Sequence, residues 1–265
     1  MKFLKRLLGG NVLYYPGCMS KFVLPDLQLI YEKLLRTCGI DFIKLRDLEV
    51  CCGSPVKNAG YLKKFEELAK KNFEVFKQHS VREIICNCPA CANTFKNEYP
   101  KVLSEWNIDV KHVTEVLLEA LDNNKLEVKA CEKRVRVTYH DPCHLGRYYG
   151  IYEEPRKILE KLGYEVVEME ECQEEALCCG GGGGVRANYP ELSREMAKER
   201  ASQALATGAK ILVTACPLCL INLKEAIGKR MKVWDIGMVL VKHSTKISKV
   251  GLDISSEFKS EFLWD

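Results

Sequence analysis

The chain has 265 residues, of which 47% are hydrophobic and 29% charged, and its formal net charge is +4. This length supports one large or two medium domains, and the hydrophobic fraction excludes a disordered chain. Charges of both signs are mixed, so no nucleic-acid partner is predicted. The basic N-terminus lacks the apolar core of a signal peptide, and no apolar run of about 18 residues occurs. We therefore expect a cytoplasmic protein that is not an integral membrane protein.

Short apolar runs alternate with helical patterns from the N-terminus onward. The patterns predict a strand at 12–15, a helix near 25–37, a strand at 41–45, a helix near 61–78 and a strand at 83–86. A short helix after Pro89 and a strand–helix pair from 110 follow. This alternation predicts α/β units around a largely parallel sheet, with the loops that follow the strands on one edge.

The second part of the chain repeats the first. Each copy carries a single cysteine, an adjacent pair and a Cys-Pro-x-Cys, and equivalent cysteines lie 125 to 128 residues apart. The ten positions are Cys18, Cys51, Cys52, Cys88 and Cys91, then Cys143, Cys178, Cys179, Cys216 and Cys219. So steady an offset indicates gene duplication. We predict two similar Rossmann-like α/β halves, residues 1–122 and 135–265, joined by a polar linker at 123–134.

The ten repeated cysteines follow predicted strands, so each set of five should converge at the carboxyl edge of its sheet. A Cys-x-x-Cys alone suits zinc, iron or a redox disulfide. Structural zinc takes four ligands, whereas a multi-iron cluster can use a fifth thiolate to bridge two irons. We therefore interpret the ten cysteines as cluster ligands. The other four are interpreted as packed thiols; they are Cys38, Cys86, Cys131 and Cys172.

The second adjacent pair runs into five glycines, which the first pair lacks. Gly180, Gly181 and Gly182 are candidates to bring backbone N–H groups close to cluster sulfur. A loop that needs positive φ or flexibility is the alternative. If the glycines bind the cluster, the asymmetry indicates that the second half hosts the tighter or the catalytic site.

Polar residues surround Cys143: His140, Asp141, His144 and Arg147. His144 directly follows the cysteine and is our candidate for a proton donor to a departing thiolate. Hydrogen bonding that fixes the loop is the equally open alternative for the histidines. Arg147 is a candidate to bind an anionic substrate or partner, with surface salt bridging as the alternative.

The motifs described above, spread from about 12 to 243, resemble the cysteine-rich CCG domain family. Within it, the chain is similar to the B subunit of heterodisulfide reductase and to the C-terminal part of the D subunit. The resemblance implies two noncubane 4Fe-4S clusters, each held by one set of five cysteines, with a disulfide cleaved between them. Some members hold zinc in the N-terminal site, so zinc in place of one cluster stays open.

The sequence lacks the cysteine run of a bacterial ferredoxin. Electrons would therefore come from a partner, a ferredoxin-like iron–sulfur subunit or a flavoprotein subunit. One hypothesis is reduction of a disulfide substrate to thiols. A second is electron transfer from a flavin-dependent dehydrogenase of the glycerol-3-phosphate, glycolate or lactate type to a quinone or other carrier. A third is a structural zinc module. A cleft between the clusters, wide enough for a disulfide and lined with cationic residues, would favour the first.

Overall fold

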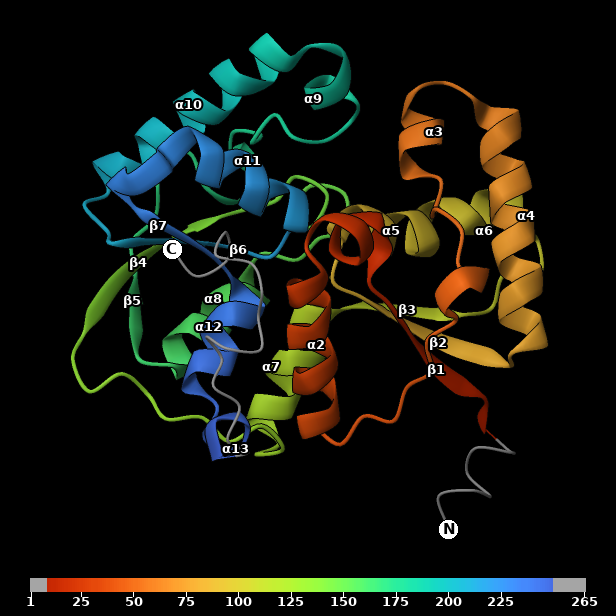
Figure 1. The fold of residues 1–265 in the computed structure, drawn as a ribbon, viewed down its shortest axis with the longest axis horizontal. Coiled ribbons are helices and arrows are strands. Elements are labelled where there is room, and N and C mark those ends of the chain that lie inside the picture. Colours follow the sequence, from red (N-terminus) through yellow and green to blue (C-terminus); the bar gives the residue numbers. More distant parts are fainter. Residues whose placement is uncertain (1–8, 250–265) are drawn as a thin grey trace.

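Two parallel sheets, one in each half of the chain, organise the fold (Figure 1). The structure is a computed structural model that describes residues 9–249. The prediction of an α/β fold built from two similar halves is confirmed. The outer ends of the predicted halves lie outside the described residues, and the division at 123–134 stays a prediction.

The first sheet has three strands in the order β1-β2-β3: β1 (Asn11–Tyr15), β2 (Val81–Cys86) and β3 (Asp109–His112). Its register aligns Tyr15, Cys86 and His112, the last residues of the strands. The helices of this half are α2 (Pro25–Thr37), α3 (Ser54–Asn58), α4 (Leu62–Gln78), α5 (Pro89–Asn93), α6 (Tyr99–Val102) and α7 (Val113–Asp122). Short helical turns occupy Met19–Val23, Arg46–Leu48 and Thr94–Glu98.

The second sheet has four strands in the order β5-β4-β6-β7: β4 (Val135–His140), β5 (Tyr164–Val166), β6 (Ile211–Thr214) and β7 (Lys232–Asp235). His140, Thr214 and Asp235 are aligned at its carboxyl edge. The helices are α8 (Glu153–Lys161), α9 (Val185–Asn188), α10 (Pro190–Ala206), α11 (Pro217–Ile227), α12 (Ile236–His243) and α13 (Thr245–Lys249), with single turns at Gln173–Glu175 and Gly228–Arg230. Buried apolar strands such as β6 are typical of parallel sheets that are covered on both faces.

The predicted strand at 41–45 is wrong. Only Ile43 pairs with β1: its N–H donates to the Val12 carbonyl, and its carbonyl accepts from the Tyr14 N–H. Arg46 then adopts a positive φ of 48° and opens the Arg46–Leu48 turn, which leads the chain away from the sheet. In the second half β5 pairs with β4 over three residues. The predicted strand at 41–45 therefore makes one bridge to the sheet, through Ile43, because the Arg46–Leu48 turn follows it directly.

The two halves pack through helices near the middle of the molecule, α2 against α12 and α7 against α8 (Figure 1). Across this interface the Tyr31 hydroxyl donates a 2.5 Å hydrogen bond to Oδ1 of Asp235, and both side chains are buried. The same carboxylate oxygen caps α12 by accepting from the Gly237 N–H at 2.8 Å. One buried carboxylate therefore links the start of α12 to the first half.

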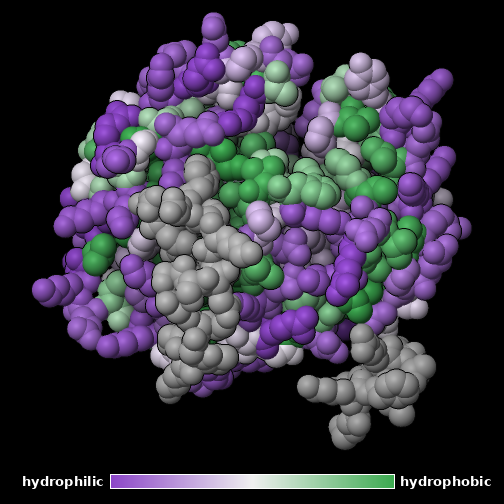
Figure 2. Space-filling view, in the orientation of Figure 1, coloured by the Kyte–Doolittle hydropathy of each residue, from purple (hydrophilic) through white to green (hydrophobic). Residues whose placement is uncertain are grey.

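Hydrophobic residues gather across the middle of one face, where the Met19–Val23 turn meets α11 (Figure 2). Phe22 and Val23 in this turn are 74% and 53% exposed. Figure 2 also shows a hollow between the halves at the top of the view, on the side where α3 and α9 face each other in Figure 1. Within residues 9–249, no helix combines the length and the apolar character needed to cross a membrane.

Candidate metal centre

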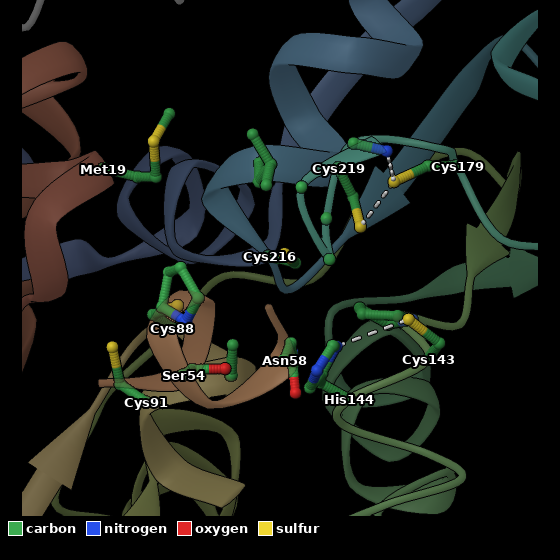
Figure 3. A pocket seen from close by; sticks show the side chains of 18 of the residues that line it. Met19, Ser54, Asn58, Cys88, Cys91, Cys143, His144, Cys179, Cys216 and Cys219 are labelled. Carbon is green, nitrogen blue, oxygen red and sulfur yellow. Dashed lines mark hydrogen bonds between the residues drawn. The ribbon is translucent and has the colours of Figure 1, made fainter. Parts of the chain in front are cut away.

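All ten repeated cysteines line one cavity between the two halves, with a volume of about 190 Å³. Figure 3 shows Cys88 and Cys91 on one side of it, facing Cys143, Cys179 and Cys219 on the other. Helix α3 contributes Ser54, Pro55 and Asn58 to the lining, and the second half contributes the glycine run before α9. The structure therefore brings together two cysteine sets that lie in separate sheets.

In the first set, the strand ends and helix starts place the sulfurs. Cys88 and Cys91 open α5 directly after β2. Cys18 follows β1, after Gly17 with φ +74°. A Cβ atom at Gly17 would lie 3.0 Å from Sγ of Cys91 and 3.3 Å from Cβ of Cys88. Only glycine lets this loop approach the Cys-Pro-x-Cys so closely. Cys18 is the exposed member of the set, whereas Cys52 and Cys91 are buried.

The second set is arranged in the same way. Cys216 and Cys219 open α11 after β6, and Cys143 follows β4. Sγ of Cys179 lies 3.2 Å from Sγ of Cys219, and Sγ of Cys143 lies 4.0 Å from Sγ of Cys178. These distances join four of the sulfurs, and Cys216 lines the same cavity, so three loops bring the five cysteines together. The donor set is therefore all sulfur, which is the ligand type that iron–sulfur clusters and zinc prefer.

Crowding and burial perturb the thiols. Hydrogen bonds to the Cys52 and Cys88 sulfurs, followed by burial, raise the pKa of Cys91 well above its ordinary value. In the second set, hydrogen bonds to Cys179 and Cys216 and then burial have the same effect on the pKa of Cys219. Ligand cysteines bind metals as thiolates, so metal binding at either set must displace protons from these sulfurs.

Backbone N–H groups point at the adjacent-pair sulfurs in both halves. The Gly180 N–H donates to Sγ of Cys178 and the Gly181 N–H to Sγ of Cys179, each at 3.4 Å. In the first half the Gly53 N–H donates to Sγ of Cys51, also at 3.4 Å. Gly182 lines the cavity but donates no such bond. Sulfur contact is therefore not unique to the five-glycine loop.

His144, the candidate proton donor, lies beside Cys143. Its ring lines the cavity, with Nδ1 3.5 Å from Sγ of Cys143 (Figure 3). Burial lowers the pKa of His144. The ring also borders a polar hollow beside the cavity that includes Lys57 and Tyr148. Its catalytic role stays a prediction.

Other residues near Cys143 have structural partners. Arg147 donates to the backbone carbonyls of Glu174 and Ala176 at 2.9 and 2.7 Å. Asp141 forms a buried bidentate ion pair with Arg156. These contacts fix the loops around the second set.

His140 and Arg200 form a buried pair beside the second set. Arg200 Nε donates to His140 Nδ1 at 3.1 Å, and a ring nitrogen of His140 lies within 4.8 Å of the Cys179 and Cys219 sulfurs. Burial, and then the charge of Arg200, lower the pKa of His140 to about 3. Sequence reasoning considered His140 only as a neighbour of Cys143 and missed Arg200, which lies on α10. In the sequence Arg200 stands among several other charged residues of α10, and no local pattern marks it as a partner of His140.

The four remaining cysteines do not line the cavity. Cys38 is buried at the end of α2, and Cys86 is buried at the end of β2. Cys131 lies with its Sγ 3.9 Å from Nε2 of His243, on another part of the surface. The division into ten ligands and four packed thiols stays a prediction, to which the placement of the sulfurs lends support.

An iron–sulfur cluster fits the donor chemistry of each set. Five sulfurs exceed the four ligands of structural zinc, and the glycine N–H groups can donate to cluster sulfur. The residues that would hold the first cluster are Cys18, Cys51, Cys52, Cys88 and Cys91. Those for the second are Cys143, Cys178, Cys179, Cys216 and Cys219.

Relatives among characterised proteins include oxidoreductase subunits. The D subunit of a heterodisulfide reductase of Methanosarcina acetivorans, an enzyme named for dihydromethanophenazine, CoB and CoM, is 35% identical over 90% of this chain and 60% of the relative. The B subunit of the CoM/CoB fumarate reductase of Methanothermobacter marburgensis is 34% identical over 83% and 43%. The EtfAB:quinone oxidoreductase of Syntrophomonas wolfei is 33% identical over 87% and 34%. The chain thus spans roughly half or less of the length of most of these relatives, which support an iron–sulfur oxidoreductase role.

Among solved structures, glutamate racemase from Francisella tularensis has a TM-score of 0.39 and 15% identity, over 96% of this chain and 85% of the racemase. A likeness this low carries no argument. A family model described as a cysteine-rich domain, CCG, matches residues 12–96 and 137–224. These two segments contain all ten cavity cysteines. The chain belongs to the cysteine-rich CCG domain family.

Proposed function

We propose that the chain is the iron–sulfur redox subunit of a heterodisulfide reductase-like complex. In this proposal each cysteine set would hold one 4Fe-4S cluster of the noncubane type, and the two clusters would supply the redox chemistry for reducing a disulfide with electrons from a partner protein. The observation that carries the proposal is the shared cavity, because both sets of five sulfurs face it. Two independent structural metal sites would not require a common cavity between them.

The stoichiometry of the reaction matches two adjoining centres. Breaking one disulfide bond takes two electrons and two protons and releases two thiols, and each cluster would supply one electron. The protein residues would supply shape and protons. Ser54, Asn58 and Leu218 line the cavity between the two cysteine sets and would position the substrate. His144, with its ring beside Cys143, would give a proton to a departing thiolate.

One observation favours the electron-relay alternative. Among the described residues that line the cavity there is no lysine or arginine. Lys57 and Arg186 instead line two separate hollows that adjoin it. A cleft lined with cationic residues is the feature that would favour disulfide reduction over electron relay. A relay between a flavin-dependent dehydrogenase and a quinone or other carrier needs two close centres but no anionic substrate.

Anaerobic purification followed by iron, sulfide and zinc analysis tests the metal content. Two clusters require about eight irons per chain. Four irons with one zinc would contradict the two-cluster proposal and keep the family assignment. No iron under strict anaerobiosis would contradict the iron–sulfur role altogether.

A second assay separates reduction from relay. A low-potential dye is coupled to a panel of disulfides, with the electron-donating partner added once it is found. His144→Ala should slow disulfide turnover by about 10²-fold and leave the iron content unchanged, if general acid catalysis is lost. Full-rate electron transfer to a second carrier without disulfide reduction would replace the reductase proposal by the relay.

A further inference from the structure

The two cysteine sets differ at two equivalent buried positions. Three residues before the first cysteine of each set stand Tyr15 and His140, and sixteen residues before each Cys-Pro-x-Cys stand Asn72 and Arg200. The four side chains are 3%, 0%, 0% and 0% exposed, in that order. The repeat therefore has the same architecture in both halves but different electrostatics beside each set.

In the first half both positions are neutral and brace the backbone. The Tyr15 hydroxyl donates to the Val50 carbonyl at 2.6 Å. The Asn72 amide donates to the Cys51 carbonyl at 3.1 Å and to the Tyr99 hydroxyl at 2.9 Å. Their donors are thus used by oxygen acceptors and do not serve the sulfurs.

In the second half the equivalent positions hold Arg200 and His140, and this pair includes a hydrogen-bond donor that lacks an acceptor. Arg200 stays protonated, so its Nε–H donates to His140 Nδ1 and the proton of the neutral imidazole sits on Nε2. Within residues 9–249, this buried Nε2 has no hydrogen-bond partner. The imidazole lies beside the Cys179 and Cys219 sulfurs, with one ring nitrogen within 4.8 Å of both. A buried donor without an acceptor is costly, and sulfur at this site would satisfy it.

Arg200 adds a buried positive charge whose hydrogen-bond partners are neutral, and the carboxylates of Asp141 and Glu171 act on it only through longer-range attraction. Its Nη1 donates to the Glu171 carbonyl and to Gln203 Oε1, each at 2.6 Å. In the described part of the chain its Nη2 has no partner. A buried cation that is not hydrogen-bonded to a carboxylate is poorly compensated for the loss of water. Negative charge at the second cysteine set would offset this cost, and the charge grows when the centre takes up an electron.

We infer that His140, backed by Arg200, is a positioning residue that makes the second cysteine set the stronger electron acceptor of the two. Its Nε2–H donates a hydrogen bond to a sulfur of the centre bound there. Hydrogen bonds to sulfur and nearby positive charge stabilise the reduced form of such a centre. At equilibrium, an electron shared between the two centres would reside mainly on the second. The inference rests on the proposed function, because it requires a redox centre in each half.

The test is an EPR-monitored redox titration of anaerobically prepared wild type, His140→Phe, His140→Gln and Tyr15→Phe. The signal of the second centre is the one that Cys179→Ser removes. In His140→Phe we expect the equilibrium constant for reducing this centre to fall about tenfold, which is 59 mV for a one-electron couple. His140→Gln keeps an N–H donor and should fall less. Tyr15→Phe, the matched control, removes a hydroxyl that serves a carbonyl and should change neither potential.

The outcomes distinguish a failure of this inference from a failure of the proposed function. An unchanged potential of the second centre in His140→Phe, with both centres present, overturns the inference and leaves the proposed function standing. An EPR coupling that shows nitrogen bound to iron also overturns it. If His140→Phe does not fold, the imidazole tautomer in ¹⁵N-labelled wild-type protein decides: Nε2–H supports the inference and Nδ1–H refutes it. No redox centre in the wild type refutes both.

Discussion

Gly180→Ala should damage the second cysteine loop far more than the same change two residues later. Gly180 has φ +75°, in the left-handed region that L side chains rarely adopt. A Cβ atom there would lie 2.8 Å from the Ser193 carbonyl oxygen and 2.9 Å from Cβ of Met196. Both obstacles belong to α10, whose backbone cannot give way easily. The loop and α10 are also joined by the Ser193 hydroxyl, which donates to the Gly180 carbonyl at 2.9 Å.

The cost has two parts. Left-handed backbone costs roughly 1–2 kcal/mol for an L residue, and overpacking of a buried contact costs roughly 1–3 kcal/mol. The sum of about 2–5 kcal/mol is a large share of the roughly 5–15 kcal/mol that stabilises a domain. At about 2–4 °C per kcal/mol, the melting temperature should fall by about 10 °C.

Gly182→Ala is the matched control. Its Cβ atom would meet nothing within 4 Å, and its φ lies outside the left-handed region. We expect no loss of stability there. The assay is anaerobic thermal unfolding followed by tryptophan fluorescence, with iron content measured on the same samples. Equal melting temperatures for the two variants, or a drop confined to Gly182→Ala, would refute the steric reasoning.

Three further predictions concern the ligands, the metal and the buried interface. Cys179→Ser should remove the iron of the second set, whereas Cys38→Ser should leave the iron content unchanged; equal losses would mean that the ligand set is misassigned. Chelation or air oxidation should lower the melting temperature markedly, because ten crowded sulfurs lose the cation that holds them together; an unchanged melting curve after complete iron removal would contradict this. Burial raises the pKa of Asp235 to about 7, above the value of about 3.9 in an unfolded chain. Because the folded pKa is the higher one, the stability that this group contributes is complete below about pH 4 and is lost as the pH rises to about 7. Asp235→Asn cannot ionise, so denaturant titrations at pH 4 and 7 should show a fall in unfolding free energy that is smaller by up to about 4 kcal/mol than in wild type. An identical fall in both proteins would show that Asp235 does not titrate in this range.

Much of the fold and the spacing of the cysteines could be read from the sequence, because the signals are local. β1, β2 and β4 are short runs rich in β-branched and aromatic residues, and the Cys-Pro-x-Cys after β2 places two sulfurs at the start of α5. Local signals misled at 41–45, where a suitable apolar run was followed by the Arg46–Leu48 turn and paired through Ile43 alone. Apolar composition shows that a segment is suited to a sheet, but the neighbouring turn decides how far it stays in one.

Only the tertiary structure decided how the halves face each other. The shared cavity depends on the packing of α2 against α12 and on the bond between Tyr31 and Asp235, which are 204 residues apart. The pairing of Arg200 with His140 spans 60 residues and is equally invisible in a linear pattern. The three candidate glycines also separate only in three dimensions, because α10 crowds Gly180 and nothing approaches Gly182. Such contacts depend on how complete elements pack, and no short window of sequence contains that information.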